Sequence, residues 1–127
     1  MRKTGGVCMG WDVFFHPAFD REFSEYPEDL QDEMVAHFNL IAQFGPHLKR
    51  PYAGTLKGSV VNNLKELRFR HKGAVWRVAY AFDPSRCAVV LCAADKRGKN
   101  DRKFYERFIM LAERRFLEWL KQDRGGQ

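Results

Sequence analysis

Two short segments, 64–70 and 75–80, constrain the fold more than any other part of the sequence, because apolar residues occupy alternate positions in them, at 67 and 69 in the first and at 76, 78 and 80 in the second. This period of two is typical of β-strands with one buried face, since successive side chains of a strand point to opposite faces. A turn at residues 71–73, which contains Gly73, separates the segments, so they are predicted to pair as an antiparallel hairpin. The apolar face of this hairpin is expected to carry Leu67, Phe69, Trp76, Val78 and Tyr80.

The opposite face of the hairpin is charged. Glu66, Arg68 and Arg70 alternate with the apolar residues of the first strand, and Arg77 has the same place in the second. A guanidinium group is permanently charged and can bind two phosphate oxygens at once, so several of them beside one carboxylate are typical of a surface that binds phosphate or another acidic ligand. The hairpin therefore predicts a binding site as well as a sheet.

The distribution of charge supports a polyanionic partner. The chain has 127 residues and a formal net charge of +6, with 45% apolar residues, which suits a single domain with a core of its own. Residues 1–60 carry 6 basic and 8 acidic side chains, whereas residues 61–127 carry 16 and 8. A basic half is typical of proteins that bind polyanions, although a basic surface that only interacts with water has the same composition.

Metal centres and disulfides are not indicated. The three cysteines, Cys8, Cys87 and Cys92, form no Cys-x-x-Cys pair, and the four histidines lack the spacing of metal ligands. No apolar run is long enough for a signal peptide or a membrane span, so a reducing, cytoplasmic location without a membrane partner is expected. We therefore expect no cofactor and no bound metal.

Helix-boundary residues predict a small α+β domain. Pro17 and Pro27 are each placed to begin a helix, and Gly45 with Pro46 ends the second one. The expected order is a strand at 11–16, two helices, the hairpin, a third antiparallel strand at 87–93 and a last helix at 101–121.

The domain is expected to span residues 10–121, with residues 1–9 as a disordered extension and 122–127 as a tail. The residues of the last helix that are expected to face the core are Tyr105, Ile109, Ala112, Phe116 and Trp119.

A second basic segment precedes this last helix. Five of the nine residues at 95–103 are Lys or Arg, and Asn100 is placed to cap the helix, whose N-terminus adds a partial positive charge. Because the segment follows the third strand of an antiparallel meander, it is expected beside the strand that carries Arg77. The side chains expected to converge on one concavity are Arg68, Arg70, Arg77, Arg97 and Tyr105.

Such a concavity suits RNA cleavage by the 2′-hydroxyl of the RNA itself. This reaction needs in-line geometry, a base for the hydroxyl and positive charge on the phosphate. Arg77 and Arg68 are expected to supply the charge, Glu66 is a candidate base, and Lys96 or Lys99 is placed to assist the leaving oxygen. The remaining candidates for RNA binding are Arg70, Lys72, Arg97, Lys99, Arg102 and Lys103.

Structural roles remain open for two of these residues. Glu66 is equally well explained as an ion-pair partner of Arg68 or Arg77. Tyr105 either stacks on a base or orients a hydroxyl, or it packs in the core.

These motifs resemble the RelE/ParE toxin superfamily, and within it the HigB-type toxins, including their phage-derived branch. The resemblance is carried by residues 64–69, 76–80, Asp95-Lys96-x-Gly98 and Phe104-Tyr105, and in the N-terminal part by 10–13 and 15–17. It implies a microbial-RNase-like fold and ribosome-dependent cleavage of mRNA. It also implies neutralisation by an antitoxin, often a helix-turn-helix protein, and contact with operator DNA only through the antitoxin complex.

The resemblance extends to single residues. Arg77, Arg97 and Tyr105 match positions of the RelE pattern, but Glu66 stands where RelE has a lysine. A lysine-based mechanism therefore does not transfer, which leaves Glu66 and Lys96 open as acid–base groups. The alternatives are a ParE-like toxin that inhibits DNA gyrase, and a catalytically silent module that binds antitoxin or operator DNA.

Overall fold

The computed structural model describes residues 3–4, 10–61, 64–95 and 100–125 of the chain. Within these residues six strands form one sheet in the order β1-β2-β6-β5-β4-β3. The strands are β1 (Lys3–Thr4), β2 (Asp12–Phe15), β3 (Ala53–Thr55), β4 (Lys65–His71), β5 (Ala74–Phe82) and β6 (Cys87–Asp95). The helices are α1 (Pro17–Ser24), α2 (Glu28–Phe44), the short 3-10 helix η1 (Gly45–His47) and α3 (Asp101–Gly125). The predicted α+β class and the order of the predicted elements are confirmed.

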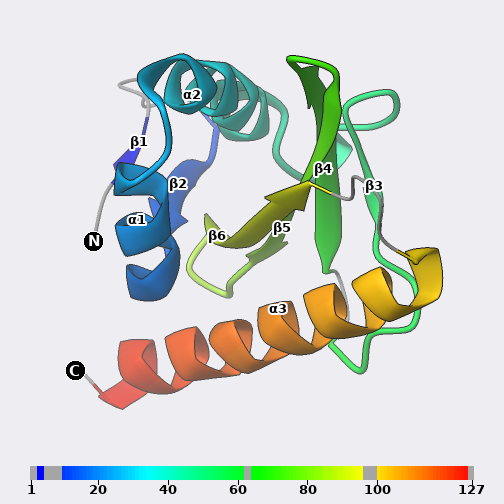
Figure 1. The fold of residues 1–127 in the computed structure, drawn as a ribbon. Helices are drawn as coiled ribbons and strands as arrows, with labels where there is room; N and C mark the ends of the chain where they lie inside the picture. Colours follow the sequence, from blue (N-terminus) through cyan, green and yellow to red (C-terminus); the bar gives the residue numbers. More distant parts are fainter. Residues whose placement is uncertain (1–2, 5–9, 62–63, 96–99, 126–127) are drawn as a thin grey trace.

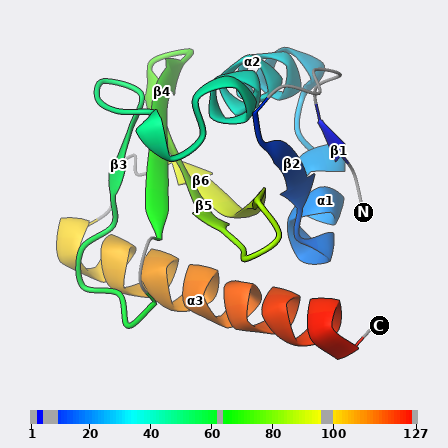
Figure 2. The same ribbon diagram turned by 180° about the vertical axis from the view of Figure 1, so that it is seen from behind.

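Helices cover both faces of the sheet. In Figures 1 and 2, α1 and α2 lie on one side and α3 runs across the other. The first core is rich in rings, and Phe15, Phe19 and Phe38 are fully buried in it. The second core lies under α3, where Phe104 and Phe108 pack with residues of β5 and β6. Burial on two faces explains why β6, between β2 and β5, is almost entirely apolar.

The predicted hairpin is formed by β4 and β5. Its two-residue turn is Lys72–Gly73, with φ of 47° and 79°, the left-handed backbone that a type I′ turn requires at both positions. The five predicted apolar residues contribute to the core under α1 and α2, four of them buried and Trp76 partly buried. Glu66 pairs directly with Ala79, which packs in the core under α3, so the charged face of the hairpin is the α3 face.

The structure adds two strands that the sequence did not predict. Of the first nine residues it describes Lys3 and Thr4, which form β1 and pair antiparallel with β2. The edge strand β3 comes from the predicted connector and pairs antiparallel with β4. In addition, β2 pairs parallel with β6, so the sheet is mixed.

The buried stripe of α3 begins one residue earlier than predicted. Phe104 and Phe108 are buried, whereas Tyr105 and Ile109 are partly exposed. Tyr105 packs against Phe104 and Phe108 at the edge of this core and is partly exposed, so the expectation that it faces the core is confirmed in part.

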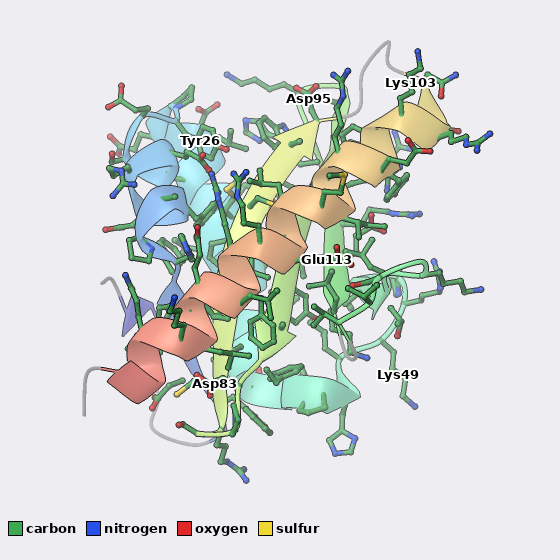
Figure 3. All side chains as sticks on the ribbon, turned by 90° about the horizontal axis from the view of Figure 1, so that it is seen from below. Tyr26, Lys49, Asp83, Asp95, Lys103 and Glu113 are labelled. Atoms are coloured by element: carbon green, nitrogen blue, oxygen red, sulfur yellow. The ribbon has the colours of Figure 1, made fainter. Side chains whose placement is uncertain are left out.

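Polar contacts fix α3 against the sheet. The buried Arg115 donates from Nη1 and Nη2 to the carboxylate of Glu22 in α1, at 2.9 and 2.6 Å, and from Nη1 to the carbonyl of Leu91 at 2.8 Å. On the other flank of α3, Glu113 accepts from Ser59 Oγ and from the Val60 amide, both at 2.7 Å. Figure 3 shows Glu113 near the middle of the helix. These contacts hold the middle of α3 in place against α1, β6 and the segment that contains Ser59 and Val60.

Across the described ranges, no helix has both the length and the apolar composition that crossing a membrane would require.

Candidate active site

Three arginines from the two strands of the hairpin line one cavity. Arg68 and Arg77 are direct cross-strand partners, and Arg70 follows two residues after Arg68 on the same face of β4. The cavity has a volume of about 350 Å³. It is lined by Pro51, Arg68, Phe69, Arg70, Val75 and Arg77.

Glu66 lies between two of these arginines. Its Oε1 is 3.4 Å from Arg68 Nη2 and 3.9 Å from Arg77 Nη1. The side chains of Glu66 and Arg77 are only 11% and 12% exposed, whereas that of Arg68 is 44% exposed. The ion pair considered as a structural role for Glu66 is therefore present, with both arginines.

Arg77 keeps unused hydrogen-bonding capacity. Its Nε and Nη1 are buried and have no hydrogen-bond partner among the described residues, and the same is true of Glu66 Oε2. Buried donors without acceptors are rare in folded proteins and often mark functional positions. A phosphate group that enters the cavity would bring the acceptors that these donors lack.

Tyr105 completes this group from α3. Arg77 Cζ lies 5.5 Å from the centre of the Tyr105 ring, a distance at which a guanidinium and an aromatic ring attract. Burial, and then the neighbouring Glu66 carboxylate, raises the pKa of Tyr105 to about 12. At neutral pH the phenol is therefore protonated and can donate a hydrogen bond but cannot act as a base.

The first turn of α3 divides the other predicted residues between two sides. Asn100 Oδ1 accepts from the Lys103 amide at 3.1 Å and caps the helix as predicted. Arg102 lies one turn before Tyr105, on the same side of α3, and pairs with Glu106 at 3.2 Å. Lys103, labelled at the start of α3 in Figure 3, lines a second cavity with Arg107 on the other flank.

Lys72 is not brought to the arginines. Its Nζ lies 2.7 Å from Asp29 Oδ2, so its charge is paired at the tip of the hairpin. Asp29 belongs to α2, which covers the opposite face of the sheet. The structure thus brings together Glu66, Arg68, Arg70, Arg77 and Tyr105, with Arg102 one helical turn away.

The remaining predicted residues, Lys96, Arg97 and Lys99, lie outside the described residues. The strand that leads to them ends at Asp95, which pairs with Trp76. Since Trp76 precedes Arg77, Asp95 lies beside the strand that carries Arg77, and the convergence expected for Arg97 stays a prediction. Figure 3 shows Asp95 near the same end of the molecule as Lys103.

No described cluster of three or more His, Cys, Asp or Glu side chains could hold a metal ion. Burial raises the pKa of the Cys92 thiol to about 12. Cys92 is therefore an inert part of the core at neutral pH.

One further arginine on this face was not predicted. Gly54 in β3 pairs with Glu66, and a Cβ atom on Gly54 would lie 3.4 Å from Nη2 of Arg50 and 3.6 Å from its Cζ. The guanidinium of Arg50 thus covers the face on which Glu66 lies. The only sequence signal was a glycine in the connector, and its strand and its partner became visible in three dimensions.

Comparisons with known proteins identify relatives of the chain. A family model described as "Phage derived protein Gp49-like" matches residues 21–117, a range that contains all the residues brought together at the cavity. The protein named "Putative toxin HigB3" from Mycobacterium tuberculosis is 33% identical over 114 residues, which cover 90% of this chain and 97% of that relative. A second protein from this organism, named "Putative toxin HigB2", is 36% identical over 90 residues, 70% of this chain and 44% of the relative. No solved structure matches the chain.

Proposed function

This chain belongs to the phage-derived Gp49-like family of HigB-type toxins, and on that premise we propose that it is an endoribonuclease that cleaves mRNA on the ribosome. The observation that carries the proposal is the cavity lined by Arg68, Arg70 and Arg77, in which Arg77 is nearly buried and has unused donors. A surface that only contacts another protein has no need for a buried arginine with free donors.

Positive charge at the phosphate is the main contribution of this site. When a 2′-hydroxyl attacks the adjacent phosphorus, negative charge accumulates on the phosphate oxygens. Arg77 and Arg68 are cross-strand partners, so their guanidinium groups can bind neighbouring oxygens of one phosphate. Tyr105, which stays protonated, is placed to donate a further hydrogen bond to the same group or to the leaving oxygen.

We assign Glu66 to positioning. Its Oε1 is shared by Arg68 and Arg77, and its Oε2 is buried, so neither oxygen is free to approach a 2′-hydroxyl. A carboxylate held between two guanidinium groups restricts both of them and so prepares them for the phosphate. Lys96 remains a proposed group for the leaving oxygen.

The partners follow from the same premise. We propose that the basic residues predicted for RNA binding, among them Arg102 and Lys103 at the start of α3, contact ribosomal RNA through phosphate contacts that weaken with salt. As a HigB-type toxin the chain has an antitoxin, which we propose to be a helix-turn-helix protein that links the toxin to operator DNA. The proposed location is the cytoplasm, where ribosomes and mRNA are present.

The experiment is expression of the chain in a bacterial host with primer extension on two copies of one reporter mRNA. One copy has a functional start codon, and the other is identical but untranslated. We expect growth arrest and new 5′ ends within the translated copy alone. Growth arrest with intact mRNA and gyrase-linked DNA breaks would establish the ParE-like alternative, and normal growth with intact mRNA would establish a silent binding module.

A further inference from the structure

The guanidinium of Arg50 lies on the same face as the proposed cleavage site but outside its cavity. A side chain at position 54 would point to the face that carries Glu66, because Gly54 and Glu66 are directly paired. The space left by Gly54 is covered by Arg50, whose Nη2, Cζ and Nε lie 3.4, 3.6 and 3.8 Å from the position of such a Cβ atom. The guanidinium of Arg50 therefore lies against the place that a side chain at position 54 would occupy.

The backbone holds Arg50 in this place. The carbonyl of Lys49 accepts from the amides of Tyr52 and Ala53, at 3.0 and 3.2 Å, which folds residues 49–53 into a tight turn. The carbonyl of Tyr52 accepts from the Arg68 amide at 2.9 Å and ties this turn to β4. The position of Arg50 is therefore coupled to the strand that carries Arg68.

The charge of Arg50 is not neutralised. Neither Arg50 nor Arg70 has an ion-pair partner within the described part of the chain, while Arg68 and Arg77 share the single carboxylate of Glu66. Among the described residues, Glu66 is thus the one ion-pair partner of these four guanidinium groups. Neighbouring strands are about 5 Å apart, so the row from β5 through β4 to β3 spans about 10 Å, more than one phosphate occupies.

We infer that Arg50, seated on Gly54, is a separate binding site for a phosphate of the RNA strand next to the one that is cleaved. The inference rests on the proposed function, since it extends the substrate path from the cleavage cavity to the β3 edge. A planar guanidinium that lies beside a glycine, with no side chain in the way, can present its N–H groups to phosphate oxygens. Arg50 would hold the substrate strand without touching the reacting atoms.

The test measures binding of a short single-stranded RNA that carries 2′-O-methyl groups throughout and therefore cannot be cleaved. Affinity is measured by fluorescence anisotropy over a series of salt concentrations, for the wild type and for Arg50→Ala, Arg50→Lys and Arg114→Ala. Arg114 is an exposed arginine in α3, nine residues or about 14 Å along the helix from Tyr105, and serves as the matched control.

Loss of one phosphate contact to a single strand reduces the slope of log affinity against log salt by about 0.7 and weakens binding about 5-fold at 0.1 M salt. We expect this change for Arg50→Ala, an unchanged slope for Arg50→Lys because the charge stays, and no change for Arg114→Ala. The urea unfolding midpoint of Arg50→Ala should equal that of the wild type, since the side chain is exposed.

The inference is overturned if Arg50→Ala keeps the wild-type slope, if Arg114→Ala changes it equally, or if the wild type binds no RNA. It can fail independently of the proposed function, because the RNA used here is not cleaved. A lowered slope for Arg50→Ala with no cleavage of translated mRNA would refute the endoribonuclease and retain the phosphate site. Cleavage of mRNA together with an unchanged slope for Arg50→Ala would refute the phosphate site and retain the endoribonuclease.

Discussion

Replacement of Glu66 by glutamine separates a positioning carboxylate from a catalytic base. The change keeps the size of the side chain but removes its charge, so Arg77 would be left nearly buried without an acidic partner. At a separation of about 4 Å, a pair of unit charges is worth about 1 kcal/mol in water and about 4 kcal/mol at the effective dielectric of a protein surface. The side chains of Glu66 and Arg77 are only 11% and 12% exposed, which strengthens their attraction, but their charged atoms are 3.9 Å apart. We therefore expect a value between these two limits, a fall of about 2 kcal/mol in the free energy of unfolding.

The matched control is Glu106→Gln. Glu106 is closer to its partner Arg102, at 3.2 Å, but the side chains are 60% and 89% exposed. If burial and not distance determines the strength of these pairs, Glu106→Gln should leave the urea unfolding midpoint unchanged. Equal effects of the two substitutions would refute this reasoning.

Kinetics of the same variant test the role of Glu66. If Glu66 positions Arg68 and Arg77, Glu66→Gln lowers the cleavage rate at every pH by one factor and retains the acidic limb of the pH–rate profile. If Glu66 is the base, that limb disappears with the carboxylate. Single-turnover cleavage of mRNA on purified ribosomes across a pH series distinguishes the two, and loss of the limb would contradict the positioning role.

Two further predictions follow from Tyr105 and from the buried pair between α1 and α3. Because burial and Glu66 raise the pKa of Tyr105 to about 12, its hydroxyl stays protonated between about pH 6 and pH 9. Tyr105→Phe should therefore lower the cleavage rate about 100-fold, by the same factor throughout this range, and a factor that varies with pH would contradict a donor role. Glu22→Gln weakens two charge-assisted hydrogen bonds from the buried Arg115. Since Glu22 is 43% exposed, we expect a loss of about 1–2 kcal/mol in urea unfolding, and wild-type stability would show that this contact does not fix α3.

The parts of the fold that could be predicted are those with strong local periodicity. The hairpin was recognisable because Leu67 and Phe69 alternate with charged residues, and Gly73 suits the left-handed backbone of its turn. The strand β3 has three residues, Ala53–Thr55, without apolar alternation, and its pairing with β4 depends on a long-range register. Such a short edge strand has no signal of its own in the sequence.

The site was predictable where it depends on strand geometry and less so where it depends on helix rotation. Arg68 and Arg77 had to share a face with Glu66 once the hairpin was assumed, and the structure places them together. The rotation of α3 is set by the packing of Phe104, which turns Tyr105 toward Arg77 and Lys103 to the opposite flank. In the sequence, positions 104 and 108 and positions 105 and 109 are both apolar, so either pair could face the core. The two choices differ by a rotation of the helix by one residue, about 100°, and the sequence does not distinguish them.

Arg50 was not recognised because its position depends on two features that are not local. The tight turn at residues 49–53 and the pairing of Gly54 with Glu66 bring it onto the charged face. In the sequence it is only an exposed arginine in a connector. Gly54 alone does not indicate which side chain lies against it.

The most direct test of the central claim is the rate at which purified protein cleaves translated mRNA on ribosomes, compared between the wild type, Arg77→Ala and Arg114→Ala. Arg77 supplies the most buried guanidinium at the proposed phosphate site, so Arg77→Ala should lower the rate at least about 100-fold while circular dichroism shows a folded protein. Arg114→Ala, which removes an exposed arginine elsewhere, should cleave at the wild-type rate. Cleavage by Arg77→Ala at the wild-type rate would contradict the proposed site, and absence of cleavage by the wild type would contradict the endoribonuclease itself.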